Sequence, residues 1–159
     1  TLAMIDGFLT QVGAVSYVIP LEIVSECIDV PRECVSYPDR MVGYFDLRGE
    51  VLPYLDLAHY HRHPITGHHR RSLIVVRDGH TKIGLVVDRL IGEHQTVIKP
   101  LSQIFRHLRA IAGSTILGSG EVALVLDVPA LVACATKARH GAEAAHVAIA
   151  SHTDHPPLP

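Results

Sequence analysis

Histidine is the residue type in this chain with the clearest capacity for chemistry, because five of the 12 histidines fall within one short segment. Imidazole rings bind zinc and copper, so a dense histidine tract can hold such a metal. No cysteine or carboxylate near the tract strengthens a metal site. The surrounding segment, 59–71, is polar and rich in turn-forming residues, so it is interpreted as an exposed connecting loop. A metal-binding protein that uses this loop is the alternative. The five residues are His59, His61, His63, His68 and His69.

Other residues that could act in catalysis have simpler structural explanations. His94 lies in a strand-like run without a paired acid at a useful spacing, which favours a structural role over that of a base or phosphate acceptor. Asp56 and Asp127 each end an apolar run, so each is expected to cap a helix. The sequence contains no glycine-rich phosphate loop, G-x-S-x-G or H-E-x-x-H pattern in the required context. No catalytic residue, metal site or cofactor is therefore predicted.

The composition limits the class of protein. With 159 residues, 48% of them hydrophobic, the chain is either one domain or two very small ones that share an interface. A formal net charge of −2 and 5% aromatic residues argue against nucleic-acid binding. The cysteines, Cys27, Cys34 and Cys134, are widely spaced, which favours reduced thiols and a cytoplasmic location. No apolar run is long enough to span a membrane, so no insertion is expected. The chain starts without methionine and is interpreted as a fragment of a longer protein.

A hairpin-like pattern occurs twice. Residues 43–57 read GYFDLRGEVLPYLDL, and residues 114–128 read STILGSGEVALVLDV. The matching glycine, glutamate, valine, leucine and aspartate are separated by a constant 71 positions, from 49 to 120 and from 56 to 127. The same alternate positions are apolar in both copies, so the same face is expected to be buried in each. This preserved register indicates two related β units.

Short apolar runs between turn-forming residues predict ten strands and an all-β fold of two small barrels that share an apolar layer. A helix is expected after Asp127, and Pro53 is expected to mark a sheet edge or a bulge. The predicted strands lie near 7–12, 15–19, 22–29, 41–47, 50–55, 72–77, 80–87, 90–98, 112–117 and 121–126.

Longer stretches resemble a known family. Residues 84–101, GLVVDRLIGEHQTVIKPL, and 110–131, AIAGSTILGSGEVALVLDVPAL, closely resemble the C-terminal regulatory domain of the chemotaxis histidine kinase CheA. Residues 45–57 resemble the hairpin that this domain shares with the adaptor CheW. The resemblance covers roughly 1–132, and Ala110 stands where the family often has glycine. It implies two SH3-like five-stranded barrels packed side by side, a short C-terminal helix and a flexible tail, in agreement with the internal repeat.

The first 13 residues, TLAMIDGFLTQVG, resemble the junction between the ATP-binding and regulatory domains of the kinase, which favours a kinase fragment over a free adaptor. The stand-alone CheW-like adaptor is the alternative of the same fold. The expected division is the end of an upstream ATP-binding domain or linker at 1–6, a first barrel at 7–62, a connecting loop at 63–71, a second barrel at 72–135 and a disordered tail at 136–159.

The resemblance implies docking without catalysis. The domain would hold a histidine kinase in a chemoreceptor array, bind a CheW-type adaptor, and contact chemoreceptor tips and the rest of the kinase. Arg48 is the most informative candidate, because a turn needs no arginine and its charge is available for a partner or for a carboxylate of this chain. The glycines can equally serve only to close their hairpins. The candidate partner-binding residues are Arg48, Gly49, Glu50, Ile83, Leu85, Gly118, Ser119 and Gly120.

Overall fold

The computed structural model of the chain describes residues 3–35, 40–64 and 70–152. Within them lie ten strands: β1 (Ala3–Val12), β2 (Val15–Pro20), β3 (Val24–Asp29), β4 (Val42–Leu47), β5 (Glu50–Asp56), β6 (Ser72–Asp78), β7 (Thr81–Val87), β8 (Arg89–Ile98), β9 (Ile111–Ile116) and β10 (Val122–Leu126). The same ranges contain the helices α1 (Arg32–Val35), α2 (Leu57–Tyr60) and α3 (Val128–His152), and the 3-10 helices η1 (Leu21–Ile23) and η2 (Gln103–Phe105). The predicted all-β fold is confirmed.

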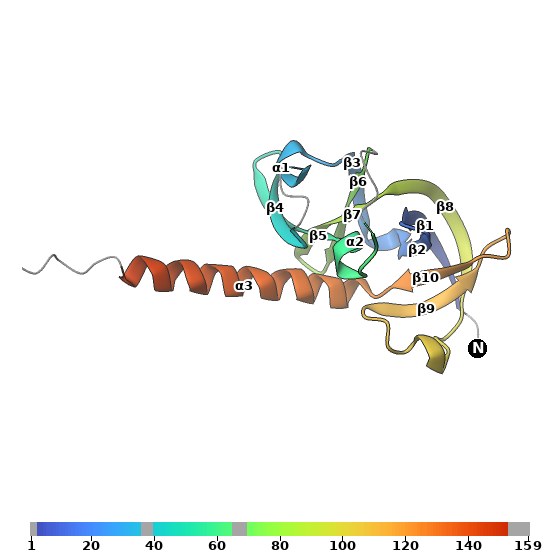
Figure 1. The fold of residues 1–159 in the computed structure, drawn as a ribbon. Helices are drawn as coiled ribbons and strands as arrows, with labels where there is room; N and C mark the ends of the chain where they lie inside the picture. Colours follow the sequence, from blue (N-terminus) through green and yellow to red (C-terminus); the bar gives the residue numbers. More distant parts are fainter. Residues whose placement is uncertain (1–2, 36–39, 65–69, 153–159) are drawn as a thin grey trace, which may run out of the picture.

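The strands form two five-stranded sheets of the same design, which lie side by side (Figure 1). The strand order is β8-β1-β2-β10-β9 in one sheet and β3-β6-β7-β5-β4 in the other. Both sheets are mixed, because each contains one parallel pair among antiparallel pairs. This pair is β2 with β10 in the first sheet and β5 with β7 in the second. The repeated hairpin, β4–β5 or β9–β10, occupies the same end of each sheet. The expectation of two related five-stranded units is therefore confirmed.

The chain builds these sheets in an interleaved order, which differs from the sequential division expected from the sequence. Strands β1 and β2 join β8, β9 and β10, whereas β3 to β7 form the other sheet. The expected barrels at 7–62 and 72–135 are therefore wrong as units, because the hairpin β6–β7 pairs with β3 and β5. Residues 3–6, expected to lie upstream of the domain, pair with 95–98 of β8 and belong to the fold.

In the described part of the chain, three hydrophobic cores stabilise the two sheets. One lies inside the β3–β7 sheet and contains Phe45, Leu52 and Val75, and a smaller one around Leu9 and Val18 lies inside the other sheet. The largest core takes residues from both sheets and from α3, so the expected shared layer is confirmed. Its members include Val12, Tyr17, Ile19, Leu55, Ile74, Ile83, Leu85, Leu126, Leu131 and Ala135. Because most of the buried apolar surface lies between the sheets, the two units stabilise each other.

The two copies of the hairpin differ in their turns. Leu47 pairs with Glu50, so β4 and β5 are joined by two residues, and the φ angles of Arg48 and Gly49 are 51° and 89°. Positive φ at both positions is what a type I′ hairpin turn requires. In the second copy five residues, 117–121, lie between the strands, and φ at Gly120 is 85°. The first turn is therefore the shorter and tighter of the two.

Both repeats end in a helix that an aspartate caps, as expected. Asp56 Oδ1 accepts a hydrogen bond of 3.0 Å from the amide of Ala58, and Asp127 Oδ1 accepts one of 3.2 Å from that of Ala130. Pro53 lies on an inner strand and not at an edge. It is tolerated because the ladder between β5 and β7 begins one residue later, at Tyr54.

Helix α3 is longer than expected. The expected C-terminal helix is present, but it has 25 residues and ends at His152, so 136–152, expected in a disordered tail, are helical; 153–159 lie outside the described residues. Leu131, Val132 and Ala135 are buried against the sheets, and the helix then extends beyond them (Figure 1). The residues that follow are rich in alanine, the strongest helix former, which favours continuation of the helix. The described residues contain no helix that is both long and apolar enough to traverse a lipid bilayer.

Candidate docking surface

The turn between β4 and β5 carries an ordered ion pair. Nη2 of Arg48 lies 2.7 Å from Oε1 of Glu26 on β3, and the two side chains are 72% and 30% exposed. Strands β3 and β4 are the two edges of their sheet, so this pair joins the edges at one end. The sequence left open whether Arg48 pairs with a carboxylate of this chain or of a partner. Arg48 does pair within the chain, and its guanidinium also remains accessible to solvent.

A second ion pair lies close to the same turn in sequence. Nζ of Lys82 on β7 lies 3.5 Å from Oε2 of Glu50, and Gly49 donates an amide hydrogen bond of 2.8 Å to Oδ1 of Asp46. Both ion pairs are largely exposed, so each contributes little to stability. The turn is therefore held in one shape while its charges remain available to a partner.

The turn between β9 and β10 is small and uncharged at its tip. Leu117 donates its amide hydrogen to the carbonyl of Glu121 at 2.8 Å, and Ser119 Oγ accepts one from Glu121 at 3.4 Å. Gly118, Ser119 and Gly120 are all exposed, and no atom lies within 4 Å of a Cβ added at either glycine. A partner could approach this backbone closely.

Apolar side chains beside both turns were not identified from the sequence. Val51 and Val122 occupy matched positions in the repeat and are 61% and 51% exposed, although the pattern predicted a buried face there. The prediction was right further along each strand, because Leu55 and Leu126 are buried. Ile116, the cross-strand neighbour of Val122, is 58% exposed. The sequence did contain a signal for this surface, because both copies of the hairpin have an apolar residue at the same position next to the turn.

Ile83 and Leu85 do not belong to an exposed surface. Both lie on β7, the central strand of its sheet, and neither has exposed area. The prediction of a docking edge at these residues is therefore wrong. Alternating apolar residues on a hairpin strand are equally compatible with an edge and a centre, and here the parallel pairing with β5 makes β7 central.

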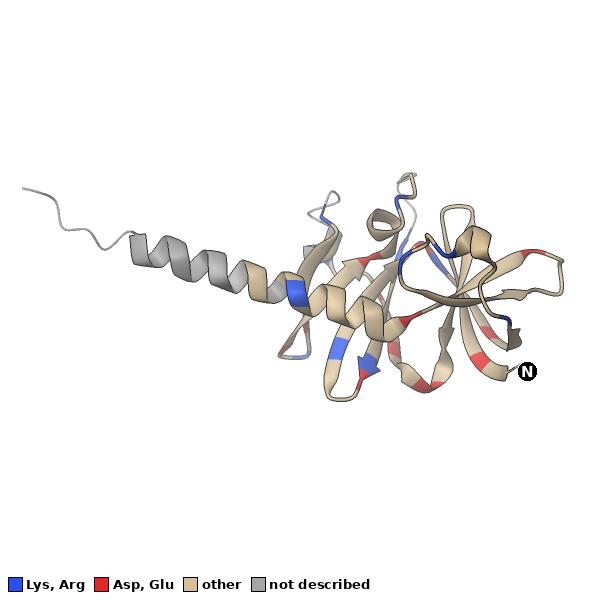
Figure 2. Ribbon diagram, turned by 90° about the horizontal axis from the view of Figure 1, so that it is seen from below, with Lys and Arg blue, Asp and Glu red and all other residues tan. Residues whose placement is uncertain are grey.

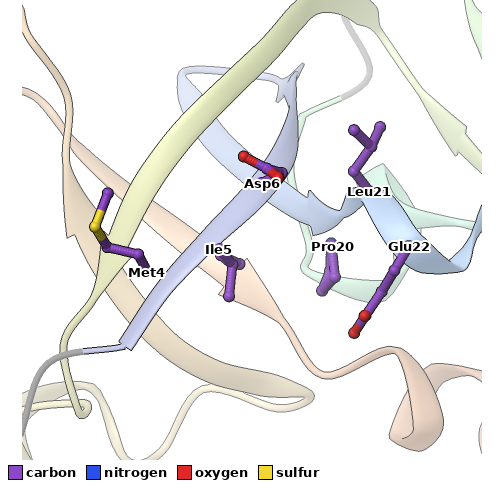
Figure 3. Close-up of a pocket in the computed structure, with 6 residues that line it drawn as sticks. All are labelled: Met4, Ile5, Asp6, Pro20, Leu21 and Glu22. Atoms are coloured by element: carbon purple, nitrogen blue, oxygen red, sulfur yellow. The ribbon is translucent and has the colours of Figure 1, made fainter.

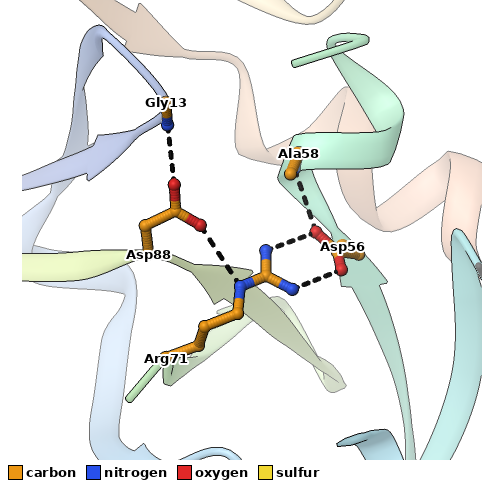
Figure 4. A network of polar contacts seen from close by, with 5 residues as sticks. All are labelled: Gly13, Asp56, Ala58, Arg71 and Asp88. Carbon is orange, nitrogen blue, oxygen red and sulfur yellow. Dashed lines mark hydrogen bonds and ion pairs between the residues drawn. The ribbon is translucent and has the colours of Figure 1, made fainter. Parts of the chain in front are cut away.

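A polar network connects the two sheets (Figure 4). Arg71 donates two hydrogen bonds of 2.7 Å to the carboxylate of Asp56, and its Nε donates a third, of 3.2 Å, to Asp88. Asp88 also accepts a 2.7 Å hydrogen bond from the amide of Gly13 in the β1–β2 turn. Burial lowers the pKa of Arg71, but its bonds to Asp56 and Asp88 outweigh burial and raise it. The network thus fixes the position of one sheet relative to the other.

The histidine segment is not simply an exposed linker. His61 and His63 are half-buried, and both contact the ring of Tyr17. His59 lies on α2, whereas His68 and His69 lie outside the described residues. Within 3–35, 40–64 and 70–152 no three histidine, cysteine, aspartate or glutamate side chains are arranged to hold a metal ion.

An open pocket of about 420 Å³ lies beside the start of β1 (Figure 3). Its lining combines the carboxylates of Asp6 and Glu22 with apolar side chains from β1 and from the junction of β2 with η1. This mixed lining differs from the closed apolar cavities that hold small-molecule ligands. The lining residues are Met4, Ile5, Asp6, Pro20, Leu21 and Glu22.

Charge is distributed without a preferred sign. Figure 2 shows acidic and basic positions interspersed over the sheets in the described part of the chain. A nucleic-acid-binding face would gather lysine and arginine on one side. The described surface instead offers two ordered turns. Charged side chains of both signs lie at the first turn, and an exposed valine lies beside each.

Two matched five-stranded sheets around a shared apolar layer define the class of the protein as a double-barrel β domain. The CheW-like domain family matches residues 6–135. The chain belongs to this family. The resemblance to CheW-like sequences is therefore confirmed.

The sequence is also similar to known proteins. It is 34% identical over 138 residues to the chemotaxis protein CheA of Salmonella typhimurium and 38% identical over 138 residues to that of Treponema pallidum. These matches cover 82% and 83% of this chain but only 20% and 16% of the relatives. The chain thus spans a fifth or less of the length of these two relatives.

Among solved structures, the fold is similar to that of the scaffolding protein TtCheW from Thermoanaerobacter tengcongensis. The TM-score is 0.64, and the match covers 78% of this chain and 89% of that chain. Sequence identity is 16%, so this likeness concerns the fold alone.

Proposed function

We propose that this chain is the regulatory and scaffolding domain of a chemotaxis-type sensor histidine kinase. The observation that carries the proposal is the similarity to CheA proteins, at 34% and 38% identity over more than four fifths of the chain. The domain would act in the cytoplasm and would dock the kinase to a CheW-type adaptor and to the cytoplasmic tips of chemoreceptors. ATP hydrolysis and phosphotransfer would belong to other domains of the whole protein.

The two sheets suit a domain that transmits a change of position. The shared core and the Arg71 network hold the sheets as one body, so a force on one hairpin moves the other. Receptor state would reach the kinase as a shift in the population of assembled states, biased by contacts that differ between those states.

The docking residues in this proposal lie at the two turns. Arg48 and Glu50 supply charge at the first turn, and exposed apolar side chains lie beside both. Interfaces of this kind combine a small apolar centre with a polar rim. The second turn would let a partner approach the backbone. Its residues are Gly118, Ser119 and Gly120.

Binding measurements with matched variants test the docking proposal. Val51→Glu and Val122→Glu place a charge on side chains that are 61% and 51% exposed, so the fold should persist. If either hairpin docks the adaptor, its variant should lose at least about tenfold in affinity for a CheW-type adaptor or a receptor cytoplasmic fragment. Thr81→Glu, an exposed position in the β6–β7 hairpin, is the control and should bind normally. Normal affinity in both valine variants, with unchanged melting, would reject the hairpins as docking sites.

A stand-alone CheW-like adaptor is the second candidate, favoured by the fold match that covers 89% of the scaffolding protein TtCheW. The two functions differ in a reconstituted mixture of receptor, adaptor and kinase. A kinase domain added as a separate chain should compete for the adaptor and lower kinase activation. It should not restore activation when the adaptor is left out. If the chain restored kinase activation in the absence of the adaptor, it would act as an adaptor instead.

A further inference from the structure

Three rings from different parts of the chain meet between the two sheets. Tyr17 lies on β2, whereas His61 and His63 follow α2, which continues from β5 of the other sheet. His61 stacks on Tyr17 with ring centroids 4.9 Å apart and an interplanar angle of 15°. The hydroxyl of Tyr17 lies 2.7 Å from Nε2 of His63. These three residues, the histidine clasp, thus connect one sheet to the other.

The backbone holds both histidines in place. The amide of His61 donates to the carbonyl of Leu57 at 3.0 Å, and that of His63 donates to Ala58 at 2.7 Å. The ring of His63 packs against Gly13, where a Cβ would lie 3.0 Å from Nδ1. The clasp is therefore a closely packed arrangement and not a chance approach of surface side chains.

The hydrogen bonds of His61 identify its tautomer. Nε2 lies 3.1 Å from the carbonyl oxygen of Arg109, and a carbonyl can only accept, so Nε2 carries the proton. Nδ1 is then bare in the neutral ring, and it is buried without a partner in the part of the chain that the structure describes. A proton added at Nδ1 would have no acceptor there, which makes the charged ring costly.

The charged and titratable groups around the clasp have opposing effects on the protonation of the two histidines. Arg109 faces His61 and repels its charged form, and it also lies over the ring of Tyr60 at 5.0 Å. Asp88 attracts a charge on His63, but the same carboxylate is already shared by Arg71 and Gly13. Each histidine also repels a charge on the other, because their ring centroids are 6.4 Å apart.

We propose that the histidine clasp is a pH-sensitive contact. It holds the segment after α2 against β2 while both rings are neutral, and it weakens on mild acidification. Protonation of His61 places an unpaired charge beside Arg109, and protonation of His63 places a second positive charge in a ring 6.4 Å from that of His61 and leaves Nε2 of His63 able only to donate to the Tyr17 hydroxyl. Acidification would thereby weaken one of the connections between the two sheets.

The titration behaviour agrees with this geometry. Burial lowers the pKa of His61, Arg109 and His63 lower it further, and the hydrogen bond to Arg109 offsets part of the effect. Burial also lowers the pKa of His63, against the attraction of Asp88, and it raises the pKa of Tyr17 to about 12. Since the unfolded chain protonates His61 and His63 more readily, the contribution of these two histidines to stability is constant well above their ordinary pKa of about 6.5 and falls as the pH drops below it.

Proton titration by NMR on the 159-residue chain tests the proposal directly. The imidazole signals of His61 and His63 should titrate at lower pH in the folded chain than in the same chain unfolded in urea. In Tyr17→Phe, which keeps the ring that covers both histidines, both pKa values should stay low, because burial is the largest cause of each shift. Ordinary pKa values for both histidines in the folded wild-type chain would overturn the proposal.

Thermal unfolding provides a second readout. Between about pH 7.5 and about pH 5.5 the melting temperature of the wild-type chain should fall, and in His61→Phe, which keeps the stacked ring, the fall should be smaller by roughly 2–4 °C. His94→Gln removes an exposed histidine on β8 and should leave the fall unchanged. An equal fall in wild type and His61→Phe would contradict the clasp. If His61→Phe does not fold, the titration of the wild-type chain decides.

Discussion

Arg71 holds the carboxylate of Asp56 through two hydrogen bonds, both 2.7 Å long, from Nη1 to Oδ2 and from Nη2 to Oδ1. Asp56 is the same residue that caps α2 at the end of the first hairpin, and the third bond of Arg71 leads through Asp88 to the turn between β1 and β2. One guanidinium therefore connects the repeated hairpin of one sheet to the central hairpin of the other.

Replacement of Arg71 should destabilise the protein more than any single surface charge does. Arg71→Ala leaves the Asp56 side chain, which is 7% exposed, without its ionic partner, and we expect a loss of about 3 kcal/mol in the free energy of unfolding. Arg71→Lys keeps the charge but cannot make the two parallel bonds, so it should lie between wild type and alanine. Urea unfolding followed by far-ultraviolet circular dichroism measures both. Arg77→Ala, an exposed arginine on β6, serves as the control, and an equal loss there would refute a special role for Arg71.

A charge exchange separates the two roles of Arg48. Arg48→Glu should leave the free energy of unfolding nearly unchanged, because the pair with Glu26 is largely exposed, while weakening partner binding. The double variant Glu26→Arg with Arg48→Glu restores the ion pair with its ends reversed. If Arg48 contacts the partner, binding stays weak in the double variant. Recovered affinity in a pull-down with a CheW-type adaptor or a receptor cytoplasmic fragment would show that Arg48 acts only through Glu26.

Ala110 offers a stabilising substitution. Its φ is 54°, in the left-handed region, where a Cβ is strained and glycine is not. We expect Ala110→Gly to raise the free energy of unfolding by about 0.5–1 kcal/mol, since relief of strain exceeds the added freedom of the unfolded chain. Ala112→Gly, two residues later on β9, should lower it instead. A destabilised Ala110→Gly variant would show that the backbone at this position is not strained.

The sequence predicted the local elements more successfully than their assembly. Gly49, Gly120 and the capping aspartates are read from neighbouring residues, so the hairpins and the helix starts were found. The placement of β1 and β2 in the later sheet depends on the pairing of β1 with β8, 78 to 95 positions away, and of β2 with β10, 107 positions away, and no local pattern encodes it. Sequence neighbours were therefore assigned to the wrong sheet.

The candidate site shows the same limit. The turn at Arg48 was identified because its residues are local, but the partner of its guanidinium, Glu26, lies on the opposite edge of the sheet. Ile83 and Leu85 were assigned to an edge because alternation alone does not reveal how many strands flank a strand. His61 and His63 do lie in a loop, but the sequence predicted it to be exposed, because their contact with Tyr17 crosses between the sheets and leaves no local pattern.

The interleaved strand order also determines the order in which parts of the domain can fold during translation. A ribosome releases β1 and β2 first, yet their neighbours β8 and β10 emerge only after the whole of the other sheet has been made. The early hairpin must therefore wait, with its apolar face uncovered, while β3 to β7 assemble. Completion of the domain is a late, non-local step, and that step should set its folding rate.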